Sequence, residues 1–321
     1  MSEMRSEGAP SLAAWPEIPF EAWRDTCGAL HLFTQIVGKY RLARTPWVNH
    51  SWHATLYVTP RGLTTSLVPD GPLGVEVVFD FVDQQVIVEA TGGRRAAFAL
   101  GPMSVADFHA RVLESLASVG ATPDFHGRPN EVPDPIPFRQ DTAPRPWDAS
   151  AVRRFHAALV RIDRVFHQFR TGFLGKVSPV HLFWGSFDLA VTRFSGRPAP
   201  LHPGGVPALP DAVTREAYSH EVSSAGFWPG GGPVDAPAFY AYAYPTPEGF
   251  ASAEVRPAAA YFDTGAGEFI LPYEAVRSAP DPEATLLAFL ESSYAAAAGL
   301  GDWDRLSMDC PTGRPLQPRP L

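Results

Sequence analysis

The chain has 321 residues and a formal net charge of −8, and 45% of its residues are hydrophobic. This apolar content suffices to bury a core, which excludes an intrinsically disordered chain. The acidic balance and the scattered basic residues argue against a nucleic-acid partner, because a phosphate backbone binds to a basic face.

The ends of the chain give a first indication of its location. Residues 1–14 predict a flexible leader without the apolar core of a secretory signal. No stretch reaches the roughly 20 apolar residues that cross a bilayer. Cys27 and Cys310 form no zinc-binding or disulfide pattern. We therefore expect a reduced, cytoplasmic protein without a membrane partner.

The first half, residues 15–121, predicts a helix, a meander of strands and a second helix. Apolar residues recur at helical spacing from Phe20 to Val37, and Gly38 is the expected cap. A helix over 103–120, with Ser104 as its N-cap, closes this half. Antiparallel strands are expected between the two helices, at 50–59, 63–68, 75–82, 85–90 and 95–100.

A proline-rich linker, residues 122–148, separates this half from the second, residues 149–300. The second half begins with an amphipathic helix over 149–174 that Gly175 caps. An apolar strand pattern follows at 180–192, and a last helix is expected over 281–299. Residues 301–321 predict a C-terminal tail.

The two halves align with each other over part of their length. WVNHSWHATLYVT (47–59) matches VHLFWGSFDLAVT (180–192) without a gap, and each stretch follows a Thr-Pro or Ser-Pro pair. We therefore predict an internal duplication. The expected fold is α+β, with two helix–meander–helix halves packed around a pseudo-twofold axis.

Lysine is rare in this chain. Lys39 and Lys176 are the only lysines, although lysines and arginines together number 26. Each follows a glycine and lies near the expected end of a helix, where a cation can neutralise the helix dipole. The other interpretation is a compact charge that holds a carboxylate or phosphate group.

The second half is longer than the first because of an insertion at 196–236, which we expect to form a lid or binding loop. Strand alternation puts His53 and Tyr57 on one polar face and Trp184 and Asp188 on its counterpart. Where these faces meet, they would line a polar-aromatic cavity for a small molecule. A solvent-exposed sheet face is the alternative.

These patterns predict candidate site residues in three roles. The acid–base candidates are His53, Asp188, His220 and Glu221. The ligand-binding candidates are Tyr57, Trp184, Arg193, Arg197, Trp228, Lys39 and Lys176. A zinc or iron site from His53, His181 and His220 is chemically reasonable, although no spacing motif supports it.

Several stretches resemble a family of uncharacterised bacterial proteins that share a domain of unknown function. The resemblance implies no activity or cofactor. The stretches that carry it are WPEIPFEAWRDTCGALHLFTQIVGK (15–39), TPWVNHSWHATLYVTPRGLTT (45–65), EVPDPIPF (131–138), GKVSPVHLFWGSFDLAVTRFSGRPAP (175–200), REAYSHEVSSAGFWPGG (215–231) and PAFYAY (237–242).

Two functions remain open at this point. The first is a small-molecule enzyme with a histidine–carboxylate site between the halves, either with or without a metal. The second is a binding module without chemistry, which would hold its ligand on the aromatic residues.

Overall fold

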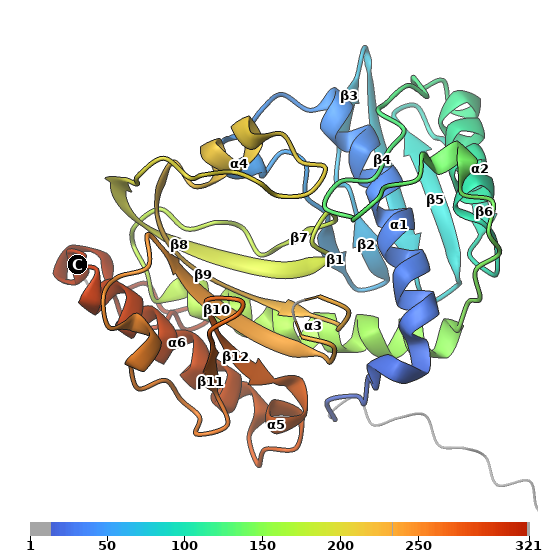
Figure 1. The fold of residues 1–321 in the computed structure, drawn as a ribbon. Helices are drawn as coiled ribbons and strands as arrows, with labels where there is room; N and C mark the ends of the chain where they lie inside the picture. Colours follow the sequence, from blue (N-terminus) through green and yellow to red (C-terminus); the bar gives the residue numbers. More distant parts are fainter. Residues whose placement is uncertain (1–13, 233, 320–321) are drawn as a thin grey trace, which may run out of the picture.

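The computed structural model describes residues 14–232 and 234–319. Their chain forms two antiparallel six-stranded sheets with helices packed around them, which confirms the α+β class (Figure 1). The predicted leader, residues 1–14, lies outside the described residues except for its last residue.

The first sheet occupies the blue and cyan part of Figure 1 and is built from β1 to β6. Its strand order is β1-β2-β4-β5-β6, and β3 pairs with β4 beside this path. The helices of this half pack together, and Phe33 of α1 stacks on Phe108 of α2 at 4.1 Å. The elements are α1 (Phe20–Arg44), η1 (Asn49–Ser51), β1 (Tyr57–Thr59), β2 (Gly62–Thr64), β3 (Val68–Asp70), β4 (Leu73–Asp80), β5 (Gln85–Ala90), β6 (Arg94–Ala99) and α2 (Val105–Ser118).

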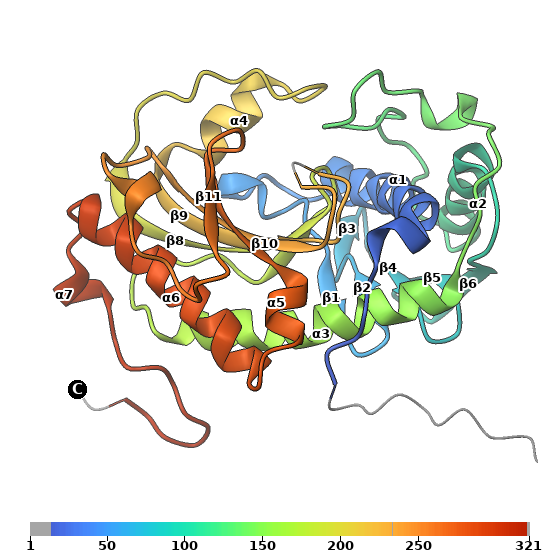
Figure 2. The same cartoon turned by 60° about the horizontal axis from the view of Figure 1, so that its bottom comes forward.

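The second sheet has the order β11-β12-β10-β9-β8-β7. α3 and α6 pack on one of its faces, and α4 lies on the side of the opposite face (Figure 2). The elements are η2 (Phe138–Gln140), α3 (Ala149–Thr171), β7 (His181–Phe183), β8 (Asp188–Pro198), α4 (Asp211–Ala217), β9 (His220–Trp228), β10 (Ala238–Tyr244), η3 (Phe250–Ser252), β11 (Tyr261–Asp263), β12 (Glu268–Pro272), α5 (Tyr273–Arg277), α6 (Pro282–Leu300) and α7 (Arg305–Met308).

The two sheets meet at one edge. Leu56, just before β1, and Leu182 of β7 exchange two backbone hydrogen bonds of 3.0 and 2.8 Å. α3 runs across the molecule and contacts strands of both sheets (Figure 2). One hydrophobic core therefore includes residues from both halves.

Several helix signals of the sequence are confirmed. Ser104 accepts a hydrogen bond from the backbone N–H of Asp107 and caps α2. The structure adds two caps that the sequence analysis did not name, because Asp148 and Asp281 accept backbone N–H hydrogen bonds at the starts of α3 and α6. α3 ends at Thr171 with Gly172 as its C-cap, so the expected cap at Gly175 is wrong.

The predicted end of the first helix is also wrong. α1 continues through Gly38 and Lys39 to Arg44. Gly38 is in contact with the indole of Trp184, and a Cβ there would lie 2.2 Å from its Cδ1 atom. The glycine thus allows a close approach inside the helix, and Lys39 is not at a helix end.

Three expectations about strands require correction. Residues 50–54 are not extended, because His50 and Ser51 both have a φ of 59° and start a turn. The stretch 180–192 is a hairpin, with Trp184 in the turn between β7 and β8. The third concerns the insertion expected at 196–236, because His220 and Glu221 begin β9, which belongs to the sheet, and only the segment before this strand lies outside the sheet.

These corrections leave the internal duplication as a prediction. Each half contains a six-stranded sheet with helices, but the aligned stretches 47–59 and 180–192 form different elements. None of the helices in the described ranges is long and apolar enough to span a membrane.

Candidate functional site

The two faces of the second sheet differ in chemistry. Leu189 and Val191 of β8 and Phe239 of β10 belong to the core beneath the sheet, against α3 and α6. The alternate residues point to the other face, which we call the polar face. Its members are Asp188, Thr192, Ser224, Gly226, Trp228, Tyr240, Tyr242, Glu268 and Ile270.

Three segments that are distant in sequence meet on the side of the polar face. The linker residue Glu131 donates its backbone N–H to the carbonyl of Pro207 in the insertion, at 3.0 Å. Asn130 donates to the carbonyl of Ala208 at 2.5 Å, and it also accepts a hydrogen bond from Lys39 of α1. The insertion therefore contacts the linker at these residues, and its role as a lid stays a prediction.

Glu131 holds the most unusual carboxyl group of this region. Burial and the nearby Asp188 carboxyl raise its pKa to about 7, although the charge of Lys39 opposes the shift. The side chain lies against Gly185, where a Cβ would come within 1.9 Å of Oε1. Glu131 itself has a φ of 57°, so its backbone adopts a left-handed conformation that is uncommon for this residue type.

Two more carboxyl groups have a raised pKa here, namely Asp188, which lies near Glu131, and Glu268, which lies near Asp188. Asp188 is buried and accepts hydrogen bonds from Ser186 and Tyr240, but burial still raises its pKa. Burial, with smaller contributions from Asp188 and Asp263, raises the pKa of Glu268 to about 8. Within the described residues, its Oε2 atom is buried without a hydrogen-bond partner.

Lys39 contributes an amine to this region. It is 3% exposed, and its Nζ atom lies 5.4 Å from the ring centre of Trp184. Burial lowers the pKa of Lys39 to about 8, and the Glu131 carboxyl opposes the shift. The hydrogen-bond acceptor of this amine is the neutral amide oxygen of Asn130, so no carboxylate is paired with it directly.

Aromatic side chains cover the centre of the polar face. Trp228 stacks on Tyr240 with ring centres 4.2 Å apart, and the ring of Tyr242 lies 6.1 Å from that of Tyr240. Gly226 makes room for the Tyr240 ring, since a Cβ there would lie 2.3 Å from it. Tyr218, which follows α4, forms a hydrogen bond of 2.9 Å with the Tyr242 hydroxyl.

The second lysine lies in a separate cluster under α4. The Nζ atom of Lys176 is 2.6 Å from Nε2 of His50, and the aromatic rings of Trp52 and Phe194 lie beside it. The backbone N–H of His50 donates to both carboxylate oxygens of Glu216 on α4, at 3.1 and 2.9 Å. This cluster fastens the insertion to the turn at 49–51.

Most of the other predicted site residues have structural partners. Arg193 is 1% exposed, and its guanidinium lies over the Phe169 ring at 3.5 Å and pairs with Glu291 at 3.4 Å. Arg197 pairs with Glu221 at 2.7 Å. Tyr57 of β1 lies beside the guanidinium of Arg41, which binds the carbonyl of His53.

The three histidines proposed as metal ligands have different neighbours. His53 contacts Val48, and His181 contacts the carbonyl of Pro179. His220 contacts Ser219 and lies 6.0 Å from the ring of His50. No group of three or more His, Cys, Asp or Glu side chains in the described parts of the chain could hold a metal ion.

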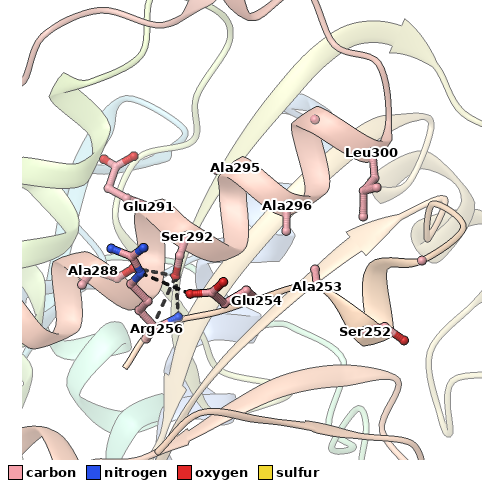
Figure 3. A pocket seen from close by; sticks show the side chains of 12 residues that line it. Ser252, Ala253, Glu254, Arg256, Ala288, Glu291, Ser292, Ala295, Ala296 and Leu300 are labelled. Carbon is pink, nitrogen blue, oxygen red and sulfur yellow. Dashed lines mark hydrogen bonds and ion pairs between the residues drawn. The ribbon is translucent and has the colours of Figure 1, made fainter. Parts of the chain in front are cut away.

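A hollow of about 800 Å³ lies elsewhere, between α6 and the segment around η3 (Figure 3). Its walls include Ala288, Ala295 and Ala296, with the Arg256 backbone N–H bound to Ser292 at 2.9 Å. None of the predicted site residues lines it. We therefore place the candidate site on the polar face.

Sequence reasoning found Asp188, Lys39, Trp184 and Trp228 but did not assign a role to Glu131 or Glu268. It also missed Tyr240 and Tyr242, although the alternation in AFYAYAY marks a strand with one tyrosine face. Glu131 lies in a proline-rich stretch, which is typical of a surface linker.

The fold and the site define an α+β protein with a carboxyl, lysine and tyrosine cluster where its halves meet. The model of a family of unknown function, DUF5996, matches residues 15–310, and the chain belongs to this family. No curated protein and no solved structure matched the chain.

Proposed function

We propose that the protein is an enzyme that transfers protons to or from a small molecule held on the polar face. The observation that carries the proposal is the placement of the Glu131 carboxyl group against Gly185 and near Lys39 and Asp188, an environment that raises its pKa to about 7. A general acid or base works best when its pKa lies near the working pH. Carboxyl groups with such shifts are concentrated at functional sites.

The surroundings of Glu131 suit a small polar ligand. Trp228, Tyr240 and Tyr242 form an aromatic wall, and the hydroxyls of the two tyrosines are bonded to Asp188 and Tyr218. Small-molecule sites commonly combine aromatic walls with a few convergent polar groups. The insertion supplies Tyr218 and is thus placed to close over a ligand.

Four residues from the sequence prediction enter this proposal, namely Asp188, Lys39, Trp184 and Trp228. We leave out Arg193, Arg197 and Glu221, because they are engaged in ion pairs with each other or with Glu291. His53, His220, Tyr57 and Lys176 have partners around the 49–53 turn, so they lie outside the proposed acid–base group. The two free cysteines support a location in the reducing cytoplasm.

The experiment is an untargeted metabolite assay. The purified protein is incubated with a small-molecule extract, and mass spectrometry follows the compounds that disappear or form. Glu131→Gln keeps the shape of the side chain but removes its proton exchange. Asp134→Asn, an exposed acid of the same linker, is the matched control. We expect turnover by the wild type and by Asp134→Asn, and a loss of at least about 100-fold in Glu131→Gln.

A binding module is the second candidate, and the continuous aromatic stack favours it. In this case a compound from the same extract raises the melting temperature but is recovered unchanged. Binding without turnover, with equal affinity in Glu131→Gln, would replace the enzyme proposal with this one.

A further inference from the structure

We propose that Lys39 is a nucleophile that forms an imine with a carbonyl substrate, an aldehyde or a ketone, and that Glu131 supplies the proton for the loss of water. This inference rests on the proposed function, since it names the substrate class of the same site. Its basis is the position of the Lys39 amine near Asn130, Glu131 and Trp184.

The surroundings of Lys39 favour an uncharged amine. The side chain is buried against the Trp184 ring, and its bonded partner is the neutral Asn130 amide. The titratable groups that face it from the linker are Glu131 and His126. Burial lowers the pKa of His126.

The residue type itself is informative at this position. Almost every other basic residue of the chain is arginine. A guanidinium stays protonated in proteins and cannot act as a nucleophile, whereas a buried lysine can lose its proton. A lysine next to a carboxyl group that exchanges protons at neutral pH provides both groups that imine formation requires.

The reaction proceeds in two balanced steps. The Nζ lone pair attacks the carbonyl carbon, the C–N bond forms, and a proton moves from nitrogen to the former carbonyl oxygen. The resulting hydroxyl then takes the proton of Glu131 and leaves as water when the C–O bond breaks. The products are a protonated imine on Lys39, one water molecule and the carboxylate of Glu131.

The test uses formaldehyde, the smallest carbonyl compound, together with cyanoborohydride to trap the imine. Peptide mass spectrometry measures methylation at Lys39, at Lys176 and at the N-terminus separately. At pH 7, a pKa of about 8 gives Lys39 about 300 times more free amine than an ordinary lysine has. We expect Lys39 to react at least about 10-fold faster in the folded chain than in urea. The expected gain is smaller than about 300-fold because burial reduces the access of formaldehyde to the amine.

Glu131→Gln separates the two roles. Acetic anhydride acylates an amine without loss of water, so its reaction at Lys39 should change less than about twofold in this variant. Methylation should slow by about 10-fold or more, because the proton donor is missing. Lys176→Arg is the control, and it should leave both reactions at Lys39 unchanged.

Two results would overturn the proposal. The first is slower methylation of Lys39 in the folded chain than in urea, a comparison that needs no variant. The second is an equal effect of Glu131→Gln on acylation and methylation. Either result can occur while the metabolite assay still shows turnover that depends on Glu131, so the two proposals fail separately.

Discussion

The carboxyl group of Glu131 acquires its properties from residues that are far from it in the sequence. Gly185, in the turn after β7, leaves the space that the side chain fills. Asp188 and the surrounding protein disfavour its ionised form, while Lys39 of α1 favours it. A proton-exchanging group thus arises where three segments converge.

The stability of the protein should depend on pH through these carboxyl groups. The pKa is raised from 4.5 to about 7 in Glu131 and to about 8 in Glu268. Above about pH 5, these two carboxyl groups therefore hold more protons in the folded state than in the unfolded state, and their contribution to the free energy of unfolding falls as pH rises toward 8. Each group contributes a slope of up to about 1.4 kcal/mol per pH unit.

Urea unfolding between about pH 5 and 8 measures this slope. Glu268→Gln should remove the contribution of Glu268, since the glutamine does not titrate, so the variant should lose less stability than the wild type between about pH 5 and 8. Glu254→Gln, at a side chain that is 86% exposed, should leave the slope unchanged. A wild-type slope that survives in Glu268→Gln would show that this carboxyl group ionises normally in the folded protein.

Residue chemistry of this kind could be predicted only in part. Asp188 is recognisable because it starts an alternating strand, and the rarity of lysine draws attention to Lys39. The role of Glu131 is not visible in EVPDPIPF, because the groups that shift its pKa approach it only in the folded chain.

At the scale of elements, Gly38 allows α1 to pack closely against the indole of Trp184. Gly38→Ala improves helix propensity by about 1 kcal/mol but places a methyl group inside the Trp184 indole. We expect a net loss of about 1–3 kcal/mol, which is typical of overpacking. A Cβ at Gly28 of the same helix would meet no atom within 4 Å, so Gly28→Ala should stabilise by up to about 1 kcal/mol.

Thermal or urea unfolding of both variants tests this prediction. If Gly38→Ala were as stable as Gly28→Ala, the contact between α1 and Trp184 would be absent or loose.

Local signals decided which elements could be predicted. The cap at Ser104 acts within a few residues, and it placed the start of α2 correctly; the starts of α3 and α6 were predicted from apolar periodicity. The stretch 50–56 has the composition of a strand, but the left-handed residues His50 and Ser51 turn the backbone. Their conformation is supported by the contact with Glu216 of α4, which is remote in sequence.

At the scale of the whole molecule, the two halves should unfold together. The backbone pairing of Leu56 with Leu182 joins the sheets, and α3 packs on both. We expect one calorimetric transition, with equal calorimetric and van't Hoff enthalpies. Two separate transitions would show that each half is stable without the other.

The organisation into two α+β halves was predictable, because helix and strand periodicities alternate along the chain in the same order twice. Their mutual arrangement was not, because it depends on single contacts such as that of Trp184 with α1. The sequence predicts a site between the halves, but it does not single out Glu131, the central carboxyl group of the site that we propose.

The most direct test of the account is a ¹³C NMR titration of the glutamate carboxyl groups, with Glu131→Gln to assign the signal of Glu131. We predict a midpoint of about 7 for this residue. A midpoint near the ordinary value of about 4.5 would contradict the account, since Glu131 would then be an ordinary carboxylate at neutral pH.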